Sequence, residues 1–71
     1  MPEHTYKIIE LVGSSKTSIE DAVDGALAAA SESLDHLDWF EIVQTRGQIQ
    51  QGRVGYYQVV LKVGFRLQRD D

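Results

Sequence analysis

The sequence has no cysteine, one proline and no long apolar run among its 71 residues. Without cysteine it can form neither a disulfide nor a thiolate zinc site, and it has no thiol nucleophile. The longest apolar stretch, around Gly25–Ala30, is far shorter than the roughly 20 residues of a membrane-spanning helix. The first five residues include neither a basic nor an apolar segment, so we expect no export signal and a cytoplasmic protein.

Basic residues are also scarce. Eleven Asp and Glu residues against seven Lys and Arg residues give a formal net charge of −4. An acidic chain without a basic cluster is poorly suited to neutralise a phosphate backbone, so we do not expect a nucleic-acid partner. A chain this short forms one domain, spanning 1–71, and removes only about 60% of its unfolded surface from water. We therefore expect homo-oligomerisation to support a marginal core.

The first half of the chain predicts a strand followed by a helix. The segment Thr5–Val12 is rich in β-forming residues and ends at Gly13. Thr17 and Ser18 are both candidate N-caps, because each precedes an acidic residue at the capping-box spacing. Apolar residues then recur with an i, i+3, i+4 rhythm, which predicts one amphipathic helix of about 18 residues.

The second half predicts two strands, Trp39–Ile49 and Val54–Leu67. The turn residues Gln50–Arg53 lie between them, so the pair should form an antiparallel hairpin. The expected fold class is α+β with the order β-α-β-β, a three-stranded antiparallel sheet wrapped around one helix. A single helix can cover only one face of that sheet.

Strict alternation in the last strand predicts which face the helix covers. The covered face should carry Tyr57, Val59, Leu61, Val63, Phe65 and Leu67, joined by Phe40 and Ile42 from the preceding strand. The opposite, outer face should then present four apolar side chains with no partner in the same chain: Trp39, Val43, Tyr56 and Val60. An apolar patch of this kind indicates a subunit interface, a ligand site, or both.

Residues that could carry catalysis or bind metal are few. Neither His4 nor His36 has the spacing of a metal motif, so we expect no metal site. The acids Asp35, Asp38 and Glu41 surround Trp39, and paired carboxylates can perform acid–base chemistry. In an acidic chain, however, a solvated charged turn explains them better.

The sequence gives little support to either of two enzyme functions. The segment 13–17 lacks the first glycine of the phosphate-loop pattern, so we reject that function. Removal of Met1 would expose Pro2, and small tautomerases of similar length use an N-terminal proline as a base. In those enzymes the proline opens directly into the first strand, whereas here two residues intervene. We therefore expect no catalytic residue, and the tautomerase remains a minor alternative.

Trp39 and Gln58 are the most informative side chains. Trp39 is the only tryptophan and stands where the helix gives way to a strand. It could pack in the core or an interface, or it could present its flat indole to another aromatic system. Gln58 interrupts the outer face of an apolar strand, where its carboxamide needs both a donor and an acceptor partner. From the pattern alone, a binding role and a purely structural role in an assembly module remain equally open.

Several motifs together resemble the dodecins, and especially the bacterial branch of that family. The matching segments run in order from about Tyr6 to Leu67: YKIIELVG, LDWFE, RG, YQV and VGFRL. The resemblance implies a flavin-binding storage protein built as a hollow homododecamer. In such a protein two flavins stack against each other between tryptophans of neighbouring subunits. Trp39 matches that tryptophan, and Gln58 matches the glutamine that bonds the polar edge of the flavin ring.

The resemblance also implies particular ligands. Bacterial members are associated chiefly with FMN, although riboflavin or FAD could occupy the same site, and some members also hold coenzyme A. The FMN phosphate needs a cation, and Arg46 and Arg66 match arginines of the bacterial pattern. Arg66 shares the outer face with Gln58, whereas simple alternation puts Arg46 on the opposite face from Trp39. Arg46 can therefore join the site only through a bulge or a strand end, and a surface salt bridge is its alternative role.

Overall fold

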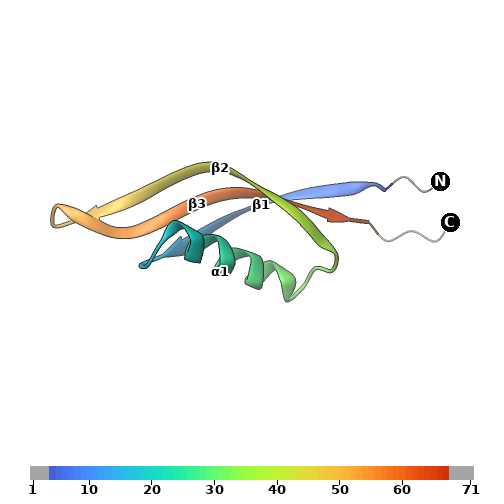
Figure 1. Ribbon diagram of the computed structural model, residues 1–71, viewed down its shortest axis with the longest axis horizontal. Helices are drawn as coiled ribbons and strands as arrows, with labels where there is room; N and C mark the ends of the chain where they lie inside the picture. Colours follow the sequence, from blue (N-terminus) through green and yellow to red (C-terminus); the bar gives the residue numbers. More distant parts are fainter. Residues whose placement is uncertain (1–3, 68–71) are drawn as a thin grey trace.

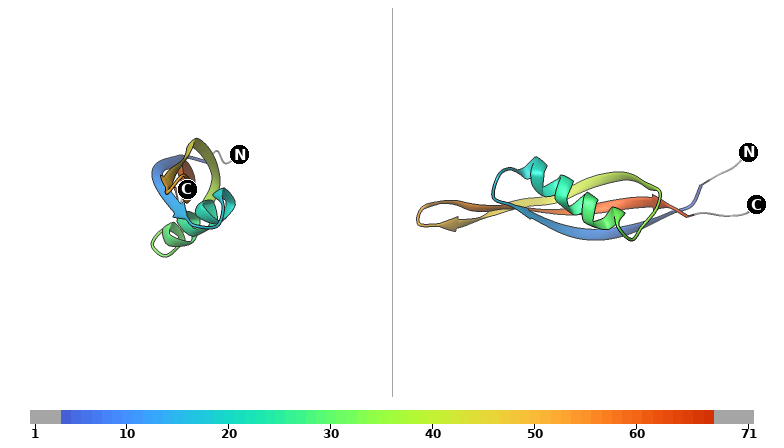
Figure 2. Two further views of the ribbon diagram at one scale, coloured as in Figure 1. Left: turned by 90° about the vertical axis from the view of Figure 1, so that its left-hand side faces the viewer. Right: turned by 90° about the horizontal axis from the view of Figure 1, so that it is seen from below.

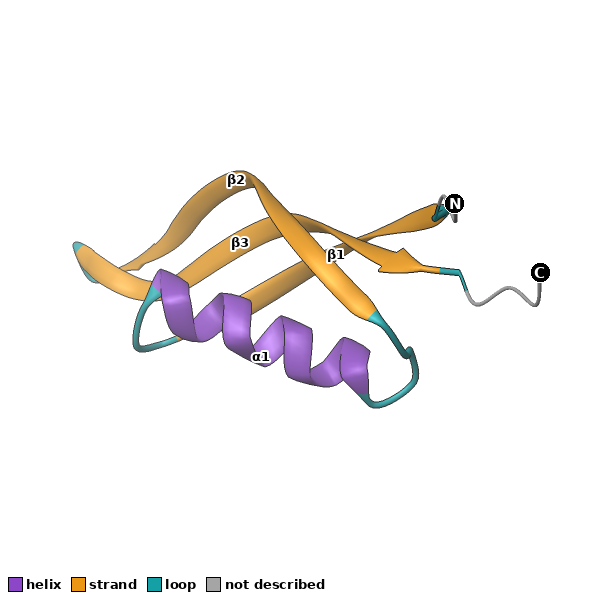
Figure 3. Ribbon diagram, turned by 45° about the vertical axis from the view of Figure 1, so that its right-hand side comes forward, coloured by secondary structure: helices purple, strands orange, loops and turns teal. Residues whose placement is uncertain are grey.

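The computed structural model describes residues 4–67 and contains one helix and three strands (Figure 1). The elements, in chain order, are β1 (Tyr6–Ser15), α1 (Ile19–Ser31), β2 (Leu37–Gln50) and β3 (Arg53–Arg66). The strands are antiparallel in the order β1-β3-β2, so β3 is central. The helix lies along one face of the sheet (Figure 3). The predicted β-α-β-β architecture is confirmed.

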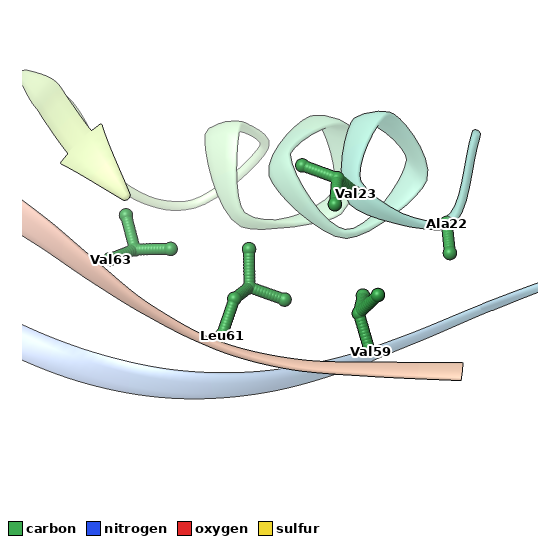
Figure 4. Close-up of a cluster of buried hydrophobic side chains, with 5 residues drawn as sticks. All are labelled: Ala22, Val23, Val59, Leu61 and Val63. Carbon is green, nitrogen blue, oxygen red and sulfur yellow. The ribbon is translucent and has the colours of Figure 1, made fainter. Parts of the chain in front are cut away.

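The core lies between α1 and the central strand. Val59, Leu61 and Val63 are fully buried and point from β3 toward Ala22 and Val23 of the helix (Figure 4). These three residues occupy alternate positions of β3, as the apolar alternation predicts. Burying each such side chain contributes about 1.5–3 kcal/mol to stability.

Close contact between β1 and α1 depends on Gly13. A methyl group at this position would lie 3.1 Å from the Cβ atom of Ala26 and would overlap the carbonyl oxygen of Ala22. The helix can therefore approach the sheet only because this residue has no side chain.

The start of the helix matches one of the two predicted caps. Ser18 is the N-cap, and its Oγ accepts a hydrogen bond from the backbone N–H of Asp21 at 2.9 Å. The buried Ser15 Oγ donates to the Asp21 carboxylate at 2.7 Å and accepts from the backbone N–H of Thr17 at 2.8 Å. The segment between β1 and α1 is thus a structural connection, in which Ser15 and Ser18 satisfy the polar groups of the first helical turn.

The end of the helix differs from the prediction. α1 has 13 residues and ends at Ser31, although apolar spacing continues to Leu37. Beyond the helix, His36 adopts φ 64° and its carbonyl accepts the N–H of Arg66 at 3.1 Å. Leu37 then begins β2 instead of extending the helix. Pairing with β3 takes precedence over helical periodicity here, as tertiary context often does.

Strand β2 is less covered than expected. Phe40 and Ile42 lie opposite Val63 and Leu61, so they occupy the helix side of the sheet as predicted. They are nevertheless 47% and 42% exposed, because α1 packs chiefly on β1 and β3. Their predicted place in the core is wrong, whereas their predicted face is right. Leu67, placed on the same face by alternation, follows the end of β3 and is 39% exposed.

The hairpin forms where the sequence predicts it. Gln51 and Gly52 have φ values of 54° and 75°, the left-handed pair that a two-residue type I′ turn requires. The ends of β2 and β3 near this turn extend past the helix and past β1 (Figures 1 and 2). Among residues 4–67, no helix is both long and apolar enough to cross a membrane.

Candidate functional site

The candidate residues lie on the outer face of the sheet, the face opposite α1. Gln58 of β3 pairs with Arg46 of β2, and Gly64 of β3 pairs with Trp39. Directly opposite residues in antiparallel strands share a face. Trp39, Gln58 and Arg46 therefore all project from the side of the sheet that the helix leaves uncovered.

A β-bulge brings Arg46 to this face. The register shifts between Ile42, which pairs with Leu61, and Gln44, which pairs with Val60. Val43 is therefore an extra residue without a direct partner, and it is 51% exposed. Such an insertion reverses the alternation of every residue that follows it in the strand. Arg46 can lie on this face only if β2 contains a bulge before it, and the structure has that bulge at Val43.

Arg46 and Gln58 form a direct hydrogen bond. The Arg46 Nε donates to the Gln58 Oε1 at 2.9 Å, and its Nη1 donates to the Gln44 Oε1 at 3.3 Å. The guanidinium is thus held by side chains from both strands. A carboxamide offers two acceptor lone pairs and two N–H donors. The bond to Arg46 uses one lone pair and leaves the Gln58 NH2 group oriented to donate elsewhere.

Trp39 presents an exposed indole supported by the neighbouring strand. Three ring atoms of the indole (Cε2, Cζ2 and Nε1) lie over the backbone of Gly64. The Tyr6 ring also contacts the indole in an edge-to-face arrangement, with centroids 6.5 Å apart and planes inclined by 61°. The Trp39 side chain is 40% exposed, and this exposed area is available to an aromatic ligand.

Arg66 lies at the same end of the sheet as Trp39. It pairs with Tyr6 of β1, two residues from Gly64 along β3, and is half-buried. Its predicted place on the outer face is confirmed. The two candidate arginines are therefore not neighbours: Arg66 belongs with Trp39, and Arg46 belongs with Gln58.

The outer face consequently carries two separate clusters. We call Trp39, Tyr6, Gly64 and Arg66 the indole end, and Gln58 with Arg46 the amide end. Gly64 and Gln58 are six residues apart on β3, or about 20 Å at the usual rise per residue. That separation is greater than the length of a three-ring aromatic system. The two ends are therefore distinct groups of residues at different positions along the same sheet face.

Two residues of the indole end, Gly64 and Tyr6, were not singled out by sequence reasoning. A glycine inside a strand often marks a close approach by another group, so Gly64 carried a usable signal. Tyr6 carried no such sequence signal, because its contact with Trp39 joins β1 to β2 across the central strand, and α1 separates these two strands in the chain.

The remaining chemical candidates do not form a site. Among residues 4–67, no three His, Asp or Glu side chains are grouped as metal ligands would be. Glu41 pairs with Lys62 across the sheet, while Asp35 and Asp38 are exposed. Pro2, the base of the tautomerase alternative, lies outside the described residues.

The fold and the outer face together define a class: a small α+β protein whose uncovered sheet face presents an aromatic platform and a hydrogen-bonding amide. The Dodecin family model matches residues 5–68. The chain belongs to the dodecin family. Dodecins are oligomeric, flavin-binding storage proteins and not enzymes, so this assignment replaces the tautomerase alternative.

Individual relatives agree with the family assignment. The chain is 54% identical over 63 residues to a dodecin from Thermus thermophilus, covering 89% of this chain and 91% of that protein. Its structure matches that of dodecin from Streptomyces coelicolor with a TM-score of 0.91 at 48% identity, over 99% of this chain and 100% of that one. A dodecin from Streptomyces davaonensis matches with the same TM-score at 41% identity, over 96% and 100% of the two chains.

Proposed function

We propose that this protein stores FMN in the cytoplasm as stacked flavin pairs, held between Trp39 residues of neighbouring subunits in a homododecamer. The observation that supports this most directly is the separation of the indole end from the amide end on one exposed sheet face. Neither end encloses a ligand within its own chain. A second subunit can bring its amide end to the first subunit's indole end and so complete the site.

The chemistry of the two ends suits a flavin. The isoalloxazine ring is flat and apolar on its faces and polar along one edge. An indole stacked on such a face contributes about 0.5–1.5 kcal/mol beyond simple burial. The Gln58 NH2 group, oriented by Arg46, can donate to a carbonyl oxygen of the polar edge. Riboflavin and FAD share this ring and would bind through the same groups.

The phosphate of FMN needs a cation near the ring. Arg46 already donates to Gln58 and Gln44, so its role is to orient the amide. Arg66 lies on the same face as Trp39 and is the better candidate for the phosphate. We retain coenzyme A as a proposed second ligand, with no residues assigned to it.

Titration with FMN tests the proposed function. The pure protein should quench FMN fluorescence strongly, because stacking on an indole provides a route for non-radiative decay. Trp39→Ala should weaken FMN binding at least about tenfold without changing the size of the oligomer. Ile49→Ala, which shortens another exposed side chain on β2, is the matched control and should bind normally.

Two results would contradict the proposed function or the role of Trp39 in it. An oligomer that leaves FMN emission unchanged at stoichiometric concentration would favour a purely structural assembly module. Tight binding by Trp39→Ala would refute the stacking role. Absorbance of the protein as purified, with mass spectrometry of any released chromophore, would show which flavin it carries.

A further inference from the structure

Gly64 provides the surface on which the Trp39 indole rests. A methyl group at Gly64 would lie 2.7 Å from the indole Nε1 and would overlap Cε2 and Cζ2. Gly64 itself is buried, although it lies on the uncovered face of the sheet. Contacts from three adjacent ring atoms mean that the indole lies across the glycine. Any side chain at position 64 would push the ring off the sheet.

Tyr6 also contacts the Trp39 indole. Its ring meets that of Trp39 edge to face, at 6.5 Å and 61°, a favourable arrangement for two aromatic rings. Tyr6 belongs to β1, Gly64 to β3 and Trp39 to β2, so all three strands contribute. The Tyr6 side chain is 41% exposed, so it is not part of the core, and its ring also contacts that of His4, with centroids 6.5 Å apart.

We infer that Gly64 and Tyr6 are positioning residues that hold the Trp39 indole against the sheet in the orientation a planar ligand requires. This inference rests on the proposed flavin function and deepens it. An exposed tryptophan on a strand normally samples several rotamers. Fixing one of them before the ligand arrives removes an ordering cost that binding would otherwise include.

Trp39 is the only tryptophan in the chain, so its fluorescence reports on this position alone. In the ligand-free protein, Gly64→Ala and Tyr6→Leu should each speed the local component of Trp39 anisotropy decay and increase quenching by acrylamide. Tyr6→Phe keeps the ring and should behave like the unmodified protein. Gly25→Ala adds the same methyl group where nothing lies within 4 Å, and should leave the Trp39 signal unchanged.

The same variants should differ in affinity for FMN. We expect Gly64→Ala to raise the Kd about tenfold and Tyr6→Leu to raise it about two- to tenfold. Size-exclusion chromatography would confirm that each variant assembles like the unmodified protein. Should Gly64→Ala fail to fold, Tyr6→Leu and its rescue by Tyr6→Phe test the inference without it.

Unchanged Trp39 anisotropy and quenching in folded Gly64→Ala or Tyr6→Leu would overturn the inference. So would an unchanged Kd for FMN alongside an altered fluorescence signal, because the orientation would then have no bearing on binding. Failure of the proposed function gives a different result. In that case the unmodified protein itself leaves FMN emission unchanged, while the ligand-free fluorescence still shows whether Gly64 and Tyr6 fix the indole.

Discussion

At the residue scale, the two candidate arginines show how side chains of one type take different roles. Arg46 uses its Nε and Nη1 to bridge Gln58 and Gln44, a fork geometry that lysine could not reproduce. Arg66 lies at the other end of the face, beside Tyr6 and near the indole. We therefore expect Arg46 to act on the flavin ring through Gln58, and Arg66 to act on the phosphate directly.

Comparing FMN with riboflavin, which lacks the phosphate, separates these roles. Arg66→Ala should weaken FMN binding about tenfold and leave riboflavin binding unchanged, because only a charge-assisted contact is lost. Arg46→Ala should weaken both ligands by similar factors, because Gln58 loses its orienting partner. The measurement is a pair of fluorescence titrations for each variant. A selective loss of FMN in Arg46→Ala, with none in Arg66→Ala, would reverse the assignment.

At the scale of secondary-structure elements, the connection from β1 to α1 is fixed by serine side chains. Ser18 caps the helix, while the buried Ser15 joins the end of the strand to Asp21 and to the backbone of Thr17. Gly13 lets the helix approach the same strand closely. Together these features set the position of α1 over β1 and β3, and they leave β2 partly uncovered.

Two neighbouring substitutions test which residue caps the helix. Ser18→Ala should lower the free energy of unfolding by about 1 kcal/mol, because the N–H of Asp21 loses its acceptor. Thr17→Ala removes the other predicted cap and should change that free energy by less than about 0.5 kcal/mol. Urea unfolding at one fixed protein concentration measures both. Equal losses of unfolding free energy in the two variants would mean that Thr17 and Ser18 share the capping role.

At the scale of the whole molecule, apolar surface remains exposed on both faces of the sheet. On the helix side, Phe40 and Ile42 border a groove with Ile19 and Val23 of α1. On the outer face, Ile8 and Val12 are more than half exposed. A small domain with this much uncovered apolar surface gains stability by assembling. The same assembly would join the indole end of one subunit to the amide end of another.

Disrupting assembly should therefore also disrupt binding. Phe40→Glu places a negative charge beside Glu20 and Asp24 in the groove and should reduce the particle mass measured by light scattering. FMN affinity should fall in parallel, although Phe40 lies on the face opposite the candidate site. Ala28→Glu introduces the same charge on the exposed side of the helix and should leave both properties unchanged. Full FMN affinity in a monomeric Phe40→Glu protein would show that one chain completes the site alone.

Local sequence features alone predict the order of elements, the hairpin turn and the buried row Val59, Leu61 and Val63, and they narrow the helix N-cap to Thr17 or Ser18. Each of these follows from local chemistry: capping side chains, left-handed turn residues and a two-residue period. The sequence also identified Trp39 and Gln58 as candidates, because each is unusual in its own segment.

The remaining features come from contacts within the folded chain. These are the end of the helix at Ser31, the exposure of Phe40, the bulge at Val43 that brings Arg46 to Gln58, and the positions of Gly64 and Tyr6 around the indole. All of these depend on how β2 pairs with β3 and on where α1 comes to rest. Contacts between residues distant in the chain set the strand register and the position of the helix. Local periodicity does not predict such contacts.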